Sequence, residues 1–253
     1  MIRGSTPPVK GIITTKEINN DYEINEVPDI NQLFVDTGLS QSQLAKRGVE
    51  IGSYLSLERT DHEIGNPEYI AGKALDDRVG CFILLELAKR LKKSGRDIYY
   101  AYTVQEEVGL YGAKVSTYQI DPDLAIAVDV SNANDTNEEP TKVVGNGPVV
   151  TMKDDEMIGN GCLNDYLKHL GKKMKIPLQL EVSNFGTTDA LTISLSKGGV
   201  PATSLGVAVR NIHTTHSIAS KKDIEQCIGI IHAFCEKPPV HCIGEENTMM
   251  KEK

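Results

Sequence analysis

Four short segments of the chain carry acidic residues or histidines, the side chains with which proteins bind divalent metal ions. They are ALDDRVG (74–80) with Asp76 and Asp77, QEEVG (105–109) with Glu106 and Glu107, AIAVDVS (125–131) with Asp129, and RNIHTTH (210–216) with His213 and His216. A carboxylate that bridges two ions, about 3.5–4 Å apart, lets them share and activate a water molecule. Hydrolysis also needs a carboxylate that accepts a proton and is not itself a ligand. The Glu106-Glu107 pair offers one carboxylate for each role.

Three of these segments are predicted to lie where buried strands end. Strands are predicted at 98–104, 124–130 and 201–209, because each range is a short apolar run rich in β-branched or aromatic residues. Ligands of open α/β sheets bind beyond the carboxyl ends of the strands. We therefore expect the acidic residues and the histidine loop to converge on one crevice.

Each residue also has a simpler interpretation when it is taken alone. An acidic pair such as Glu106-Glu107 is often solvated surface or the favoured charge at a helix N-terminus. Asp76-Asp77 before a helix is typical of an N-cap. Asp129 is different, because an acid within an apolar strand should be buried and then needs a partner. The occurrence of all of them along one predicted sheet edge favours a functional site.

From residue 69 onward, predicted helices alternate with predicted strands, which is the pattern of an α/β layered sheet. Besides the three strands above, a fourth is predicted at 177–183, and helices are predicted at 77–93, 161–174, 187–197 and 221–235.

Residues 1–67 have a different pattern, typical of a small β-rich module. Short alternating segments at 9–15, 32–38 and 49–58 are separated by Gly, Pro and Asn, and Ser40 is placed to cap a short helix ending near Lys46. The last residues, 238–253, are predicted to form a loose tail.

Composition excludes several classes of protein. The net charge of −8 argues against nucleic acid or an anionic membrane as the main partner. The apolar runs are too short for a membrane span, and MIRGSTPPVKG lacks the apolar core of a secretory signal, so we expect a cytoplasmic protein. The five cysteines include no CxxC pair and are expected to be reduced thiols.

Five segments together resemble the glutamyl-aminopeptidase/tetrahedral (TET) aminopeptidase family, whose members are often labelled endoglucanase. They are GKALDDRVG (72–80), QEEVGLYGA (105–113), AIAVDVS (125–131), FGTTDA (185–190) and RNIHTTHSIASKKDIE (210–225). The similarity runs over residues 1–237. It implies a three-layer α/β/α metallopeptidase domain at 68–237, and at 1–67 part of a barrel-like module that serves in dimerisation and assembly. Family members remove N-terminal residues from peptides and build hollow particles from dimers.

The resemblance also implies a role for each candidate residue, with two zinc, cobalt or manganese ions as cofactors. Asp76 would bridge both ions, Asp77 would support it, Glu106 would be the general base, Glu107 and His213 would complete the shell of one ion, and Asp129 would bind the other. His216 does not match a ligand position.

The chain departs from the family pattern in one respect. The family carries a further metal-binding histidine, in an HxD-type motif that precedes the β-rich module, whereas the first histidine here is His62. We therefore expect the chain to begin inside the module and to lack the opening strands of the catalytic domain, which would expose an apolar sheet edge. The second ion would keep only Asp76 and Asp129, so we expect one firmly bound ion, one weakly bound ion and poor peptidase activity.

Two other functions compete with a peptidase. A glycoside hydrolase needs two isolated carboxylates that flank a sugar, and it gives no use for His213 alongside the acids. A non-catalytic assembly or metal-binding fragment is favoured by the missing ligand.

Overall fold

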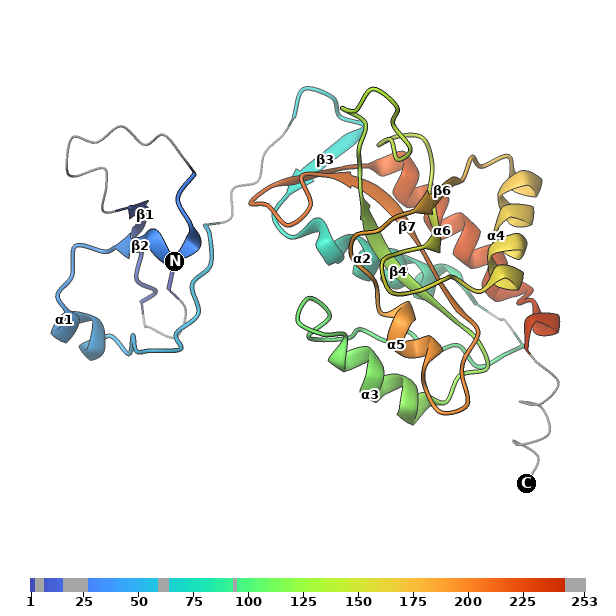
Figure 1. Cartoon of the computed structure of the whole chain (residues 1–253), viewed down its shortest axis with the longest axis horizontal. Helices are drawn as coiled ribbons and strands as arrows, with labels where there is room; N and C mark the ends of the chain where they lie inside the picture. The colour runs from blue at the N-terminus through green and yellow to red at the C-terminus, as the bar shows by residue number, and fades with distance from the viewer. Residues whose placement is uncertain (3–6, 16–26, 59–63, 93–94, 244–253) are drawn as a thin grey trace. The chain divides into compact units, whose positions relative to one another are not determined.

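The computed structural model describes residues 1–2, 7–15, 27–58, 64–92 and 95–243. His62 and residues 244–253 of the predicted tail lie outside these ranges. The chain divides into two compact units, Met1–Thr60 and Asp61–Lys253, which are described separately (Figure 1).

The first unit is built on a two-stranded antiparallel sheet of β1 (Ile12–Thr15) and β2 (Leu33–Asp36), with the 3-10 turn η2 (Ile30–Gln32) before β2. The short helix α1 (Gln41–Lys46) begins as predicted, because the Ser40 hydroxyl accepts a hydrogen bond from the Gln43 amide at 3.3 Å. The alternating segment at 49–58 forms no ladder, since Leu55 makes only an isolated bridge with Ile2.

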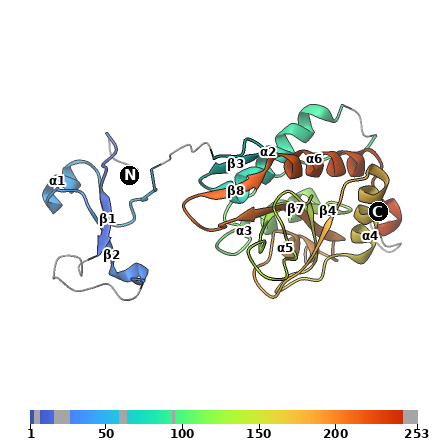
Figure 2. The same ribbon diagram turned by 90° about the horizontal axis from the view of Figure 1, so that it is seen from above.

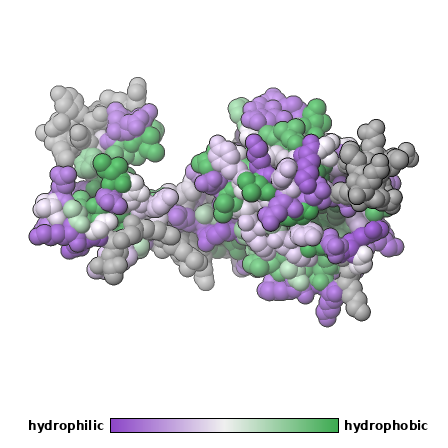
Figure 3. Space-filling model, turned by 90° about the horizontal axis from the view of Figure 1, so that it is seen from below, coloured by the Kyte–Doolittle hydropathy of each residue, from purple (hydrophilic) through white to green (hydrophobic). Residues whose placement is uncertain are grey.

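Large apolar side chains of the first unit remain exposed to solvent. Val27 is 95% exposed, Ile30 80% and Tyr54 80%. Green apolar atoms accordingly appear on the surface of this unit, on the left of Figure 3. Two strands alone form a marginal sheet, and these apolar side chains are not covered by other described residues of the unit.

The second unit is an α/β structure around a mixed sheet, so the predicted fold class is confirmed. Its strand order is β3-β8-β7-β5-β6. β4 pairs with β7 along nearly its whole length, on the edge opposite to β5 and β8. β4 and β7 run parallel with Ala125 opposite Ala202, whereas β7 is antiparallel to both β5 and β8. The strands are β3 (Tyr69–Gly72), β4 (Ala125–Asn132), β5 (Val149–Lys153), β6 (Gln179–Val182), β7 (Ala202–Arg210) and β8 (Ser217–Ser220).

Helices cover both faces of this sheet, as the view from above shows (Figure 2). On one face lie α2 (Leu75–Arg90), α4 (Gly161–Met174) and α6 (Lys221–Glu236); on the other lie α3 (Tyr111–Ile120) and α5 (Ala190–Ser194). Alternation along β4 fits the two layers, since Val128 and Val130 join the core under α2 and α6, whereas Ala127 packs with Ala190 of α5.

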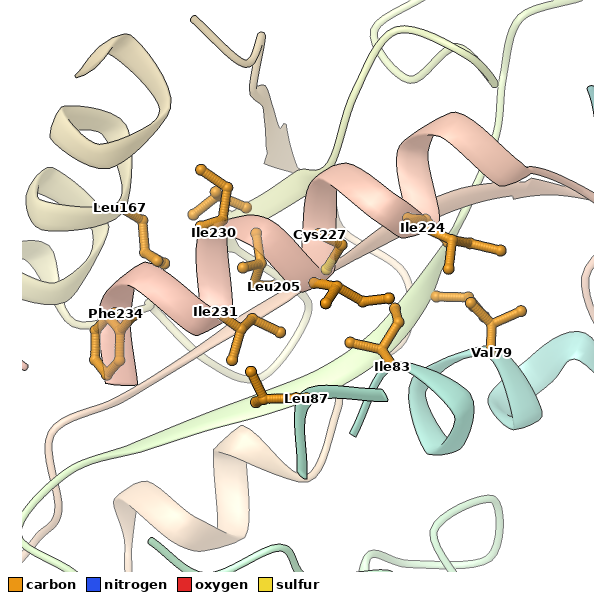
Figure 4. Packing of buried hydrophobic residues seen from close by; sticks show 14 of the residues in the cluster. Val79, Ile83, Leu87, Leu167, Leu205, Ile224, Cys227, Ile230, Ile231 and Phe234 are labelled. Carbon is orange, nitrogen blue, oxygen red and sulfur yellow. The ribbon is translucent and has the colours of Figure 1, made fainter. Parts of the chain in front are cut away.

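The main core lies between the sheet, α2 and α6 (Figure 4). Ile83 and Leu87 of α2 face Leu205 of β7 and Ile231 of α6, and all four are at most 4% exposed. Side chains of this size contribute about 1.5–3 kcal/mol each by burial. The packing therefore holds the start of α2, with Asp76, against the sheet.

Several predicted elements differ from the structure. The strand predicted at 98–104 is wrong: the segment has no ladder partner among the described residues, and Tyr99 and Val104 are exposed. The helix predicted at 187–197 is reduced to α5. Asp129 does not end its strand, because β4 continues to Asn132. The strands β3, β5 and β8 and helix α3 were not predicted.

Two of the cysteines are also not as predicted. Cys162 and Cys242 form a disulfide, with Cα atoms 5.6 Å apart, because the 3-10 turn η3 (Val240–Cys242) packs against the beginning of α4. The expectation of reduced thiols holds for Cys81, Cys227 and Cys235, which are free. The first six residues of the predicted tail are thus attached to the fold. None of the helices in the described ranges is long and apolar enough to cross a bilayer.

Candidate metal centre

Asp76, Glu107 and His213 come together from three separate parts of the second unit. His213 Nε2 lies 3.0 Å from Asp76 Oδ2 and 3.4 Å from Glu107 Oε2. One ligand atom from each residue lies within 4.8 Å of the other two, which is the spacing that a single cation needs. Two carboxylates and an imidazole form a donor set that divalent zinc accepts.

The start of α2 presents Asp76 through an irregular backbone. Asp76 and Asp77 have non-helical torsion angles, and the regular helix follows them. Asp77 Oδ1 accepts a hydrogen bond from the Gly80 amide at 2.8 Å, so the N-cap interpretation is correct for Asp77. Gly80 is needed here, because a Cβ atom would lie 2.5 Å from the carbonyl oxygen of Val128. The missing side chain lets α2 approach β4 directly.

The turn before α3 fixes the acidic pair. The carbonyl oxygen of Glu106 accepts hydrogen bonds from the amides of Gly109 at 3.1 Å and Leu110 at 3.0 Å. The Gly112 amide donates to Val104 O at 2.9 Å, and a Cβ atom on Gly112 would lie 2.3 Å from that oxygen. These hydrogen bonds fix the turn that contains Glu106 and Glu107. In this turn, Glu107 Oε2 lies 3.4 Å from His213 Nε2.

The loop between β7 and β8 carries His213 in the left-handed region, with φ of 58°. Hydroxyl groups hold the loop together: Thr214 donates to Asn211 O at 2.7 Å and to His216 O at 3.0 Å, and Ser217 donates to Asn211 O at 3.0 Å. His216 contacts Thr215 and does not belong to the three-residue donor group. The choice of His213 over His216 as a candidate ligand thus fits the geometry.

Asp129 and Glu106 lie beside the donor group without joining it. Both line a groove of about 1200 Å³ together with Asp76 and Asp77. Asp129 Oδ1 accepts a hydrogen bond from the Val130 amide at 2.7 Å. The carboxylate of Glu106 is close enough to Asp129 to raise the pKa of Asp129. The groove is therefore lined both by acids of the donor group and by acids next to it.

Burial and mutual repulsion raise the pKa of these acids. Burial, followed by the charge of Asp129, raises the pKa of Asp77 to about 9. Burial also raises the pKa of Asp129 to about 8 and that of Glu106 to about 7, with neighbouring carboxylates adding to both. Carboxyl groups gathered this way lower their free energy by binding protons or a cation. The donor set and its surroundings thus fit a divalent metal ion.

Asp189 is a further acid of the groove to which sequence reasoning gave no role. Its Oδ2 accepts a hydrogen bond from the Thr103 hydroxyl at 2.6 Å, whereas its buried Oδ1 has no hydrogen-bond partner within the described chain. Its charge raises the pKa of Glu106. The signal was the segment FGTTDA, which contributed to the family resemblance without indicating where Asp189 would lie.

The groove runs along an open edge of the sheet. β4 pairs with β7 on one side, and on its other side no ladder is found in the part of the chain that the structure describes. Residues 95–103 and the end of α6 also line the groove. Residues 125–129 of β4 line the groove along this edge.

Comparison with known proteins identifies the family. The family model for M42 glutamyl aminopeptidase matches residues 1–230. The glutamyl aminopeptidase of Lactococcus lactis is 33% identical over 212 residues, which are 83% of this chain and 59% of that protein. The chain belongs to the M42 glutamyl aminopeptidase family, whose peptidases are metal-dependent.

Solved structures agree with this assignment. An aminopeptidase from the archaeon Desulfurococcus kamchatkensis matches 92% of this chain and 66% of its own at 34% identity, with a TM-score of 0.85. A TET1 peptidase from Pyrococcus horikoshii, described as assembling into a tetrahedron or a large octahedral shell, matches 86% of this chain and 65% of its own at 25% identity, with a TM-score of 0.75. The chain spans about 58–63% of the length of four relatives that are 32–35% identical to it.

Proposed function

We propose that residues 68–237 are the main part of the catalytic domain of a metal-dependent aminopeptidase, which hydrolyses N-terminal residues from peptides. The observation that carries the proposal is the meeting of Asp76, Glu107 and His213 at one point beside a groove. Membership of an aminopeptidase family supports the same reaction.

Asp76, Glu107 and His213 would hold one divalent ion, and zinc, cobalt and manganese all suit these ligands. A bound ion supplies a Lewis acid that polarises the peptide carbonyl and lowers the pKa of a water molecule. Asp76 would also bridge to a second ion at Asp129. If these two acids were its only ligands, the second position would bind an ion weakly and would favour a harder ion than zinc.

Glu106 would act as the general base. It lines the groove, lies outside the three-residue donor group and keeps a carboxyl group whose pKa, raised to about 7, suits proton transfer near neutral pH. Glu106 would accept a proton from the attacking water and deliver it to the leaving amine. Asp77 would act through Asp76, because its hydrogen bond to Gly80 fixes the backbone from which Asp76 projects.

The acidic groove also suits the substrate's free amino group. Asp129, Asp189 and Glu106 all line the groove, and in the described part of the chain none of them is paired with a lysine or an arginine. Ionised carboxylates there would attract the ammonium of a peptide N-terminus.

A turnover assay tests the proposed function. The full chain, loaded with cobalt or zinc, is expected to hydrolyse aminoacyl-p-nitroanilides above background, and EDTA is expected to abolish the reaction. Bound metal without turnover would favour the non-catalytic alternative. Hydrolysis of carboxymethyl-cellulose instead would favour the glycoside hydrolase, which we consider the weaker reading because His213 lies 3.0 Å from Asp76.

Self-association is the second part of the proposal. The first unit exposes Val27, Ile30 and Tyr54, and the related TET1 peptidase is described as assembling into shells. We expect the purified chain to be larger than a monomer by light scattering. Changing Ile30 and Tyr54 together to Ser should shift it toward monomer, while the matched change of Leu195 and Val115, also exposed but in the second unit, should not.

A further inference from the structure

A second cluster of metal-binding side chains lies at the beginning of α4. Cys162 is the second residue of that helix, Cys242 ends η3, and the two form a disulfide across a sequence separation of 80 residues. His241 belongs to the same cluster, because one of its ring nitrogens and both sulfur atoms lie within 4.8 Å of one another. The cluster shares no residue with the candidate metal centre.

The donor atoms differ in kind from those of the metal centre. Two thiolates and an imidazole form a soft set that prefers zinc, cobalt or another thiophilic cation to calcium or magnesium. Three protein ligands leave one tetrahedral position for water. Cys242 is buried, Cys162 is half-buried and His241 is exposed, so a cation can reach the site from solvent.

The position of Cys162 favours the thiolate form that a metal needs. It lies in the first turn of α4, two residues after Asn160, whose side chain caps the helix by accepting a hydrogen bond from the Leu163 amide at 3.1 Å. The positive end of a helix dipole stabilises an anion at this point.

Aromatic packing keeps the three ligands near one another without the disulfide. The ring of Tyr166, one turn after Cys162, packs edge-on against His241 with centroids 6.4 Å apart and against Phe234 at 5.8 Å. The Tyr166 hydroxyl also donates a hydrogen bond to the carbonyl oxygen of Lys237. These contacts hold the segment from Lys237 to Cys242 against α4, so opening the disulfide leaves a site that is already assembled.

We propose that Cys162, His241 and Cys242 form a redox-controlled site for a thiophilic divalent cation, closed by the disulfide under oxidising conditions and open to metal when reduced. Two equivalents of a thiol reductant, such as a low-molecular-weight thiol, supply two electrons and two protons, which gives two cysteine thiols and the reductant's own disulfide. The cation then displaces the two thiol protons to solvent and forms two metal–sulfur bonds and one metal–nitrogen bond.

The disulfide and the bound metal ion would each link the end of the described chain to α4, beside the groove. Pro238, Val240 and Ile243, which flank the cluster, line the groove that also contains Asp76 and Glu106. Reduction without metal should therefore leave this wall held by the contacts of Tyr166 alone, and metal binding should add a further link to α4. The proposal does not depend on peptidase activity.

Cobalt absorption tests the proposal, because only thiolate ligands give a near-ultraviolet sulfur-to-cobalt charge-transfer band and the other metal centre contains no sulfur. The full chain, fully reduced and titrated anaerobically with Co²⁺, should show the band; the oxidised chain should not. Cys162→Ser and Cys242→Ser should abolish it. His241→Ala, at an exposed side chain, should weaken cobalt affinity by at least about tenfold. Loss of an outer-shell partner already costs roughly 10–100-fold in metal affinity, and loss of a direct ligand should cost no less.

Cys235→Ser is the matched control, since Cys235 is free and burial raises the pKa of its thiol to about 11. The control should keep the band. Absence of the band in the reduced wild type, its persistence in Cys162→Ser, or its presence in the oxidised chain would each overturn the proposal. Circular dichroism of every variant separates loss of the site from loss of the fold, and His241→Ala carries the test if a cysteine variant unfolds.

Discussion

His213 Nε2 lies 3.0 Å from Asp76 Oδ2, although one residue belongs to the loop after β7 and the other to the start of α2. The two elements meet because α2 packs on β4, and β4 runs parallel to β7 along its whole length. The donor pair is thus a consequence of sheet order and of the close approach at Gly80. Residues that determine this packing should affect the metal centre even when they do not touch it.

Glu106→Gln should separate metal binding from catalysis. If Glu106 is the general base, the variant keeps its metal and loses roughly 10²–10⁴-fold in kcat. Glu107→Gln, one residue away, should instead lose metal together with activity, because Glu107 belongs to the donor group. Metal analysis and turnover of a chromogenic substrate by both variants check this. Wild-type turnover in Glu106→Gln would show that Glu106 is not the general base.

Asp76, Glu107 and His213 should bind one divalent ion firmly, whereas a second ion should bind weakly. In equilibrium dialysis with zinc under oxidising conditions, which keep Cys162 and Cys242 bonded, we expect one tight ion per chain. His213→Ala should lower this affinity by more than the roughly 10–100-fold that loss of an outer-shell partner costs. His216→Ala in the same loop is the control and should leave it unchanged. Two tightly bound ions would contradict the ligand count.

The amphipathic helices could be predicted from sequence because their signals are local. α4 begins and ends where its pattern predicts, and Asn160 caps it. α6 follows Ser220, which accepts a hydrogen bond from the Asp223 amide at 3.3 Å. Capping residues and helical periodicity lie within the segment itself, so no knowledge of the rest of the fold is required.

Strands and the outer part of the site were less predictable, because their partners are distant in the sequence. The apolar segment 98–104 reads as a strand but has no ladder in the described structure, whereas the short strand β8 forms because β3 and β7 lie on either side of it. Asp189 was missed for the same reason: its position beside Glu106 depends on where α5 packs. The bond between Cys162 and Cys242 likewise joins segments with no shared local pattern.

Ile83→Ala should destabilise the fold and weaken the metal centre through α2. Ile83 is fully buried between α2, α6 and the sheet, so truncation should cost about 2–5 kcal/mol of unfolding free energy. Leu85 in the same helix is 52% exposed, and Leu85→Ala should stay within about 0.5 kcal/mol. Urea unfolding of both variants measures the difference; equal midpoints would show that α2 does not pack as described.

The metal-free protein should become less stable as the pH rises, and a divalent ion should oppose this trend. Burial raises the pKa of Asp77 to about 9 and that of Asp129 to about 8, above their ordinary value of 3.8. Between about pH 4 and pH 8–9 the folded state therefore binds more protons than the unfolded state, and stability is lost as the pH rises through the folded pKa values.

Thermal unfolding in EDTA tests this sign directly. The Tm at pH 8.5 should lie below that at pH 5.5, and saturating zinc should raise the Tm most at the higher pH, because the ion binds the deprotonated carboxylates. Asp129→Asn removes one of the two titrating groups and should reduce the pH dependence of the EDTA-treated protein. A Tm that rises with pH in EDTA, or that responds identically in Asp129→Asn, would mean that these acids are not held together in the metal-free fold.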